Sequence, residues 1–241
     1  MLKAGMSIID ITPEKGVQLG GYPHCPRPNE GVHDRLYASC MFLDNGTDRV
    51  AIVAMDIFFF TKRLCTEIRS KFDFDISFTA SHTHSAPNTG LVHDFEKNEG
   101  VFVDEAFVSD LVAKVEKIIK EAHDNTFDAE FGSYVGHCGA EQGVGGNRRE
   151  KGGVCDPAVN ILAVRDSDKK IRGILLNYAL HPTYLHADNV LVSADYPGGV
   201  RNYIHFAFPD AIFMFAQGTI GNQSSRYHRL GQTFEEACRV G

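Results

Sequence analysis

Two histidines stand two residues apart in the segment Ser81-His82-Thr83-His84, directly after the apolar run at residues 76–80. A short apolar run bounded by turn residues predicts a strand, so both imidazoles lie where extended backbone ends. Alternate side chains of an extended segment point to the same side, and we therefore expect the two rings to share one face. Neutral imidazole is a common ligand of zinc. By itself the pair is as typical of one half-buried and one solvated histidine as of a metal site.

A third histidine, His181, has the same kind of position. It follows the apolar run at residues 173–179, and Pro182 disfavours helical backbone at the residue before it. Open α/β sheets bind their ligands at strand ends. Together the two clusters predict that His82 and His181 share one metal ion. Their rings should then lie no more than about 6 Å apart, roughly two Zn–N bonds with allowance for an empty site.

Other polar residues are weaker candidates for the same site. His186 and Asp188 follow His181 closely and are expected to hydrogen bond to a metal-bound imidazole. His33 follows a glycine and is a candidate for a further ligand, although a hydrogen-bonded structural histidine is equally consistent with its position. Ser224 follows a glycine-containing turn after an apolar run, where a serine is either a site residue or a helix cap.

The elements that position these residues alternate between strand and helix. Helical spacing of apolar residues predicts helices at 104–123 and 197–208, and another is expected to begin near Leu230. The small, polar composition of residues 132–153 predicts an irregular loop. The pattern favours a single domain over residues 1–241, an α/β layered sandwich with a mixed β-sheet flanked by helices. The expected strands are residues 49–60, 76–80, 129–135, 159–164, 171–179 and 211–216.

Composition narrows the classes of partner. The formal net charge is −7 and the basic residues form no long run, which argues against a nucleic-acid surface because phosphate neutralisation needs clustered Lys and Arg. No segment approaches 18 consecutive apolar residues, and the first residues lack the pattern of a signal peptide. We therefore interpret the chain as a cytoplasmic protein without an integral membrane segment. The sequence indicates no oligomeric state.

The order of the motifs resembles the N-terminal domain of the neutral/alkaline non-lysosomal ceramidases. The resemblance covers nearly the whole chain, and the HTHS motif followed about a hundred residues later by HPT is more specific than either motif alone. The similar segments are Ala4-Gly5, Asp10-Ile11-Thr12-Pro13, Gly21-Tyr22, Gly31-Val32-His33-Asp34-Arg35-Leu36-Tyr37, Ser81-His82-Thr83-His84-Ser85, Asn147-Arg148, His181-Pro182-Thr183, Ser193-Ala194-Asp195-Tyr196-Pro197-Gly198, and Gln217-Gly218 through Gly221 to Ser224.

The resemblance implies a zinc-dependent hydrolase of sphingolipid metabolism that cleaves the amide bond of an N-acyl sphingoid base or a related lipid or small-molecule amide. Carried over to this sequence, His82 and His181 would be zinc ligands, and His84 and Arg148 would line the reaction centre. Ser224 takes the place of the serine in the family's Gly-Asp-x-Ser motif, described as a nucleophile or as a positioning group. We favour attack by zinc-activated water, because zinc lowers the pKa of its water to about 7, whereas Ser224 has no obvious neighbouring base. His84 would then move the proton to the leaving amine, and Arg148 would stabilise the oxyanion.

The sequence departs from the family pattern in three places. Asn222 replaces the aspartate of the Gly-Asp pair, and Ala86 replaces the glycine after HTHS. The resemblance also implies a Glu and a Tyr zinc ligand from sequence beyond Gly241. Because a catalytic zinc normally has three protein ligands, we expect the chain to be a truncated form that binds zinc weakly and has little amidase activity.

Two other functions stay open from the sequence. The chain is alternatively a noncatalytic or differently specialised scaffold, in which metal binds without turnover of any N-acyl amide. It is otherwise an esterase or lactonase, because acyl transfer to water from an ester needs the same activation of the carbonyl group. Metal content and a panel of amide and ester substrates separate these possibilities.

Overall fold

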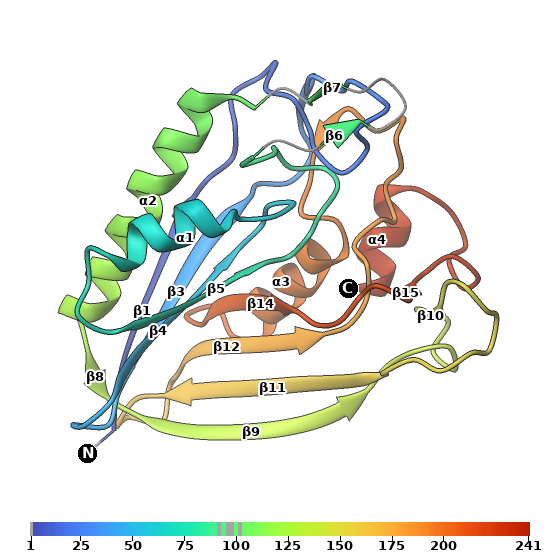
Figure 1. Cartoon of the computed structure of the whole chain (residues 1–241). Coiled ribbons are helices and arrows are strands. Elements are labelled where there is room, and N and C mark those ends of the chain that lie inside the picture. The colour runs from blue at the N-terminus through green and yellow to red at the C-terminus, as the bar shows by residue number, and fades with distance from the viewer. Residues whose placement is uncertain (1, 91–92, 95–98, 101–102) are drawn as a thin grey trace.

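Two mixed β-sheets lie face to face between two pairs of helices in the computed structural model (Figure 1). The structure describes residues 2–90, 93–94, 99–100 and 103–241. The layered α/β sandwich expected from the sequence is confirmed, with the difference that its β layer consists of two sheets instead of one. The chain builds the first sheet from strands that precede residue 129 and the second sheet from strands that follow it.

The first sheet has the strand order β5-β4-β3-β1-β8. Its strands are antiparallel except for the parallel pair β4 and β5, in which Met55 is the partner of Ala80. The loops that follow these two strands therefore begin side by side. The bounds are β1 Lys3–Asp10, β3 Tyr37–Asp44, β4 Arg49–Met55, β5 Asp75–Ala80 and β8 Phe127–Asp128.

The second sheet has the strand order β14-β12-β11-β9 and also contains one parallel pair. In this pair, β12 and β14, Tyr178 is the partner of Gln217, so these two strands also end side by side. The Gln217 backbone N–H donates to the Thr79 hydroxyl of β5 at 3.3 Å. The carboxyl ends of both parallel pairs therefore meet in one region. The bounds are β9 Glu130–His137, β11 Ala158–Arg165, β12 Ile171–Tyr178 and β14 Ile212–Gln217.

The helices cover the outer faces of the two sheets. Helices α1 (Lys62–Arg69) and α2 (Glu105–Asp124) cover the first sheet. Helix α3 (Tyr196–Ala207) packs on β14 of the second sheet, and α4 (Phe234–Val240) packs against α3. Both long helices begin within one residue of the predicted position. Helix α4 begins at Phe234 instead of near Leu230, because the Thr233 side chain caps it. Among the described residues, none of the helices combines the length and apolar composition needed to cross a bilayer.

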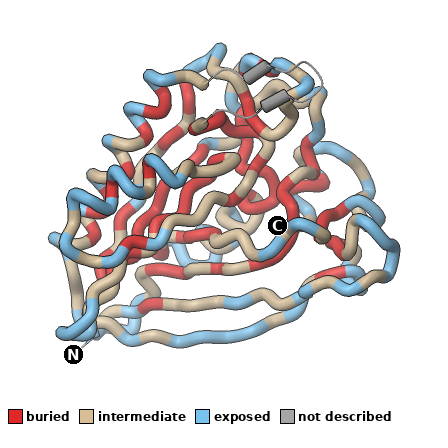
Figure 2. The backbone as a smooth tube through the Cα atoms, viewed as in Figure 1, coloured by how far each residue is buried: buried red, intermediate tan, exposed pale blue. Residues whose placement is uncertain are grey.

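The buried residues form three clusters between these elements, and the backbone that carries buried residues is red in Figure 2. Phe42 and Val115 belong to the layer between the helices and the first sheet. Met41 and Met214 meet between the two sheets, and Phe215 packs against Tyr196 under α3. The second sheet is thus sandwiched, which holds the end of β12 in a fixed position.

Two predicted segments differ from the structure. The expected strand at residues 49–60 ends at Met55, because the next residue, Asp56, accepts a bond from the Tyr37 backbone and pairs with Arg201. The strand expected at residues 129–135 is β9, an edge strand with six exposed residues that extends to His137, so the irregular segment expected at residues 132–153 begins later. The short strands are β2 Gly31–Val32, β6 His93–Asp94, β7 Glu99–Gly100, β10 Gly146–Asn147, β13 Leu191–Val192 and β15 Gln223–Ser224.

Candidate metal centre

Three histidines meet at the carboxyl ends of the two parallel strand pairs. His82 and His84 follow β5, and His181 follows β12; each offers a ring nitrogen, and the three nitrogens lie within 4.8 Å of one another. The ring centroids of His82 and His181 are 4.8 Å apart, so the predicted approach of these two rings is confirmed. His84 lies 5.1 Å from His82 and 5.2 Å from His181 between centroids.

The backbone of the HTHS segment is anchored to the loop after β4. The Ser81 N–H donates to Met55 at 2.9 Å, and the His82 N–H donates to Ile57 at 3.0 Å. His82 itself has a φ of 68°, a left-handed conformation that is rare for a residue other than glycine. The two imidazoles therefore do not meet by the alternation of an extended strand, as the sequence pattern suggested. The turn at His82 brings them together.

His82 and His181 each use Nδ1 to contact a backbone carbonyl. His82 Nδ1 lies 2.8 Å from the Phe58 oxygen, and the Phe58 ring stacks on the imidazole with centroids 4.5 Å apart. His181 Nδ1 lies 3.4 Å from the Ile220 oxygen. This arrangement places the ring proton on Nδ1 and leaves Nε2 free to bind a metal. The expectation that His186 or Asp188 would fill this role is wrong, because carbonyl groups do.

His84 differs from the other two in its surroundings. Its Nε2 lies 3.3 Å from His181 Nε2, whereas its Nδ1 is buried and has no hydrogen-bond partner. The ring is held by packing, with the Phe58 and Tyr22 centroids at 4.9 and 4.8 Å. The 3.3 Å spacing suits a hydrogen bond between the two rings. Neutral imidazole nitrogens are common zinc ligands, and ring nitrogens of His82 and His181 lie within 4.8 Å of each other, so the donor set fits zinc.

The electrostatic environment keeps the three imidazoles neutral. Burial lowers the pKa of His181 to about 4, with further contributions from His82 and Arg148. Burial also lowers the pKa of His82, and it holds the pKa of His84 well below its ordinary value. Neutral imidazoles bind metal without first losing a proton, so this cluster is ready to accept a cation at neutral pH.

Arg148 lies on the same side of the molecule as the histidines. Its backbone N–H donates to Asn222 at 2.7 Å and its Nε donates to Gly221 at 3.1 Å. Its positive charge is near enough to contribute to the lowered pKa of His82 and His181. The predicted place of Arg148 beside the cluster agrees with this geometry, and its role in catalysis stays a prediction.

Acid should destabilise the metal-free chain through His181. The folded state has a His181 pKa of about 4, against 6.5 for an ordinary imidazole, so the unfolded state binds more protons between these values. The stabilisation is present in full above pH 6.5 and is lost as the pH falls to about 4. The difference corresponds to on the order of 3 kcal/mol. Urea unfolding at a series of pH values measures it, and a slope that His181→Gln does not reduce would contradict it.

Ser224 lies in β15, which pairs with β10 so that Ser224 is the partner of Gly146. The side chain is buried, and its Oγ accepts a bond from the Arg226 N–H at 3.2 Å. The preceding residue, Gln223, accepts a bond from the His181 N–H at 3.3 Å. Ser224 is thus attached to the segment that carries His181, and no described hydrogen bond joins its hydroxyl to an imidazole.

Two glutamines that the sequence did not single out brace the end of β12. The Gln217 side chain donates to the carbonyls of Tyr178 and Leu180 at 3.0 and 3.3 Å, and the Gln223 side chain donates to Ala179 at 2.5 Å. Together they satisfy the three carbonyls that lead into His181. Both lie in residues 217–224, which begin at the last residue of β14. A glutamine beside a strand end is the only feature of the sequence that could have indicated this role.

His33, considered as an additional ligand, lies outside the three-histidine group. Its Nδ1 lies 2.8 Å from Asp34 Oδ1, and its ring stacks on Phe234 of α4 with centroids 3.7 Å apart. The exposed His33 ring therefore contacts Phe234 of α4 and the Asp34 carboxylate. These contacts fit the alternative that His33 is a hydrogen-bonded structural histidine and not a further metal ligand.

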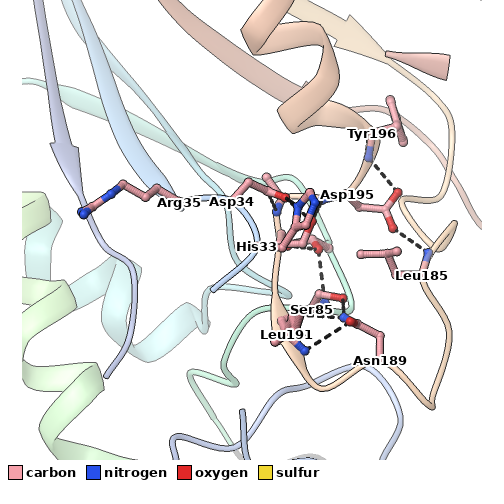
Figure 3. Close-up of polar contacts among 12 residues, drawn as sticks. His33, Asp34, Arg35, Ser85, Leu185, Asn189, Leu191, Asp195 and Tyr196 are labelled. Atoms are coloured by element: carbon pink, nitrogen blue, oxygen red, sulfur yellow. Dashed lines mark hydrogen bonds and ion pairs between the residues drawn. The ribbon is translucent and has the colours of Figure 1, made fainter. Parts of the chain in front are cut away.

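The loop before α3 fixes the segment that follows His181 (Figure 3). The Asp195 carboxylate accepts bonds from the Leu185 and Tyr196 N–H groups at 3.0 and 2.8 Å. Asp195 has φ 58° and ψ −150°, a strained conformation for a residue with a side chain. Asp34 accepts bonds from the Ala194 N–H and the Ser193 hydroxyl, both at 2.6 Å. Burial raises the pKa of Asp195 to about 6, although the backbone N–H donors act in the opposite direction.

No protein-family model matches this chain. Its fold is similar to that of the neutral ceramidase from Pseudomonas aeruginosa, with a TM-score of 0.77 and 21% identity over 92% of this chain and 39% of that chain. It is also similar to a ceramidase complexed with C2, with a TM-score of 0.80 and 19% identity over 99% of this chain and 42% of that chain. The chain spans about two fifths of these structures, and the resemblance indicated by its motifs is confirmed for the fold.

Proposed function

We propose that this chain provides the metal-binding part of a zinc-dependent hydrolase that cleaves the amide bond of an N-acyl sphingoid base or a related amide. The observation that carries the proposal is the cluster of His82, His84 and His181, three neutral imidazoles gathered at two strand ends within a ceramidase-like fold. Imidazole donors and a nearby cationic Arg148 suit chemistry in which negative charge develops on a carbonyl oxygen.

Within this proposal, His82 and His181 are the zinc ligands. Each has the backbone carbonyl at Nδ1 that orients a ligating ring and increases its basicity. Among the described residues, His84 has no hydrogen-bond partner at Nδ1, so its ring lacks the group that orients a ligand, and we assign it to proton transfer instead. When bound, zinc polarises the carbonyl and lowers the pKa of water to about 7.

The chain's other residues have distinct roles in the proposed reaction. His84 takes a proton from the attacking water and gives it to the leaving amine nitrogen. The Arg148 guanidinium stabilises the negative charge on the amide oxygen. Ser224 accepts a bond from the Arg226 N–H, which leaves its hydroxyl proton free to donate to the amide carbonyl and orient it. We further propose that residues 1–241 form a single domain and that additional zinc ligands come from sequence outside it.

Two measurements test this function. The natural full-length protein that carries this chain should contain one zinc per chain by elemental analysis and should hydrolyse short-chain N-acyl sphingosines faster than matched esters and lactones. Removal of zinc by a chelator should abolish that activity. Bound zinc without turnover of any N-acyl amide would instead support a noncatalytic scaffold, and faster ester cleavage would support an esterase. Residues 1–241 alone should bind zinc weakly and show little activity, because two histidines incompletely coordinate the ion.

A further inference from the structure

We propose that Arg27 is a positioning residue that fixes the two ligand-bearing segments of the metal centre relative to each other. The proposal rests on the proposed zinc site. Arg27 is 1% exposed, and its NH2 group donates to the carbonyls of Gly20 and His84, the latter at 2.7 Å. Its NH1 group donates to the Asn189 carbonyl at 3.0 Å. One side chain thus bonds to the segment that carries His82 and to the segment that follows His181.

The surroundings of Arg27 are unusual for a buried cation. All its hydrogen-bond partners among the described residues are backbone carbonyls, and its buried Nε has no partner. Burial lowers the pKa of Arg27, as expected when a guanidinium leaves water. A buried charge without a carboxylate costs stability relative to a well-packed apolar side chain. Stability alone therefore does not account for an arginine at this position. The planar guanidinium, whose two NH2 groups bond to three carbonyls, does account for it.

Asn189 extends the connection back to the HTHS segment. Its side-chain amide donates to the Ser85 hydroxyl at 3.0 Å and to the Leu191 carbonyl at 2.7 Å (Figure 3). The Ser85 carbonyl in turn accepts a bond from the Ser193 N–H at 3.0 Å. Arg27 and Asn189 therefore join residues on both sides of the cluster through direct hydrogen bonds.

Packing transmits this placement to the His84 ring. Arg27 lies over the Tyr22 ring, with its Cζ 4.7 Å from the centroid, and Tyr22 contacts His84 edge to face. Gly21 has a φ of 88°, and a Cβ on it would collide with the His84 ring. With no hydrogen bond at Nδ1, the ring of His84 is located by these contacts and by the carbonyl that Arg27 holds.

The test compares Arg27→Met with Arg27→Lys and with a matched control, Arg69→Met. Arg69 also donates to a backbone carbonyl, that of Ile76 at 2.9 Å, and lies over an aromatic ring, but at the opposite end of β5. Zinc affinity of the natural full-length protein is measured by competition with a chromogenic chelator at a temperature where circular dichroism shows each variant folded. We expect Arg27→Met to lower the affinity about tenfold to a hundredfold, as loss of a group that orients ligands does, and Arg69→Met to change it less than about twofold.

Arg27→Lys should lower zinc affinity as well, because an ammonium group cannot span three carbonyls in fixed directions. Unchanged zinc affinity in Arg27→Met would overturn the proposal. If Arg27→Met does not fold, unchanged zinc affinity in Arg27→Lys would overturn it. A parent chain that binds no zinc would contradict the proposed function instead. In that case, the NMR contact between the His84 and His181 ring protons in the metal-free chain tests the role of Arg27. Loss of this contact in the Arg27 variants would support the positioning role, and its persistence would overturn the proposal.

Discussion

Replacing His181 or His82 with alanine should abolish zinc retention, whereas replacing His84 should leave zinc bound. The difference follows from the Nδ1 contacts, since His82 and His181 each have a carbonyl that orients a ligating ring and His84 has none. Loss of a group that only orients a ligand lowers metal affinity about tenfold to a hundredfold, so removal of a ligand itself should cost more than about a hundredfold.

Elemental analysis after gel filtration measures retention in the natural full-length protein, and chelator competition measures affinity. His33→Ala serves as the matched control, because it removes an imidazole that lies outside the three-histidine group. Zinc loss in His84→Ala equal to that in His181→Ala would contradict the assignment. It would mean that all three imidazoles bind the ion.

The sequence predicts the region of the site well because strand ends have a clear pattern. Apolar runs that stop before His82 and His181 indicate where β5 and β12 end, and parallel neighbours bring such ends together. The amphipathic helix α2 is equally visible, with Leu111, Val115 and Ile118 buried at helical spacing. Most features that depend on local periodicity were therefore predicted, but β1 and β3 were not.

Features that depend on tertiary contacts were not predicted. The left-handed turn at His82 has no signature in a segment without glycine, and it is held by bonds to the loop after β4. The role of Arg27 depends on three carbonyls that are distant in sequence, so its type and neighbours suggest only a surface arginine. The sequence predicts a strand at residues 129–135, but β9 continues to His137, because its pairing with β11 extends to that residue.

Replacing His84 with alanine should lower amide hydrolysis about a hundredfold to ten-thousandfold with zinc still bound, the range typical for loss of a group that transfers protons. Its Nε2 lies 3.3 Å from His181 Nε2, and burial holds its pKa well below the ordinary value, so the ring is neutral at neutral pH.

Ser224→Ala should lower the rate only about a hundredfold if the hydroxyl has the proposed positioning role, because no described hydrogen bond joins it to an imidazole that would deprotonate it. Single-turnover kinetics in the natural full-length protein, with mass spectrometry of the quenched reaction, distinguish the two roles. A covalent acyl adduct on Ser224 in the parent, together with complete loss of activity in Ser224→Ala, would show that serine is the nucleophile. Without such an adduct, the larger effect at His84 means that proton transfer to the leaving amine contributes more to catalysis than orientation of the carbonyl does.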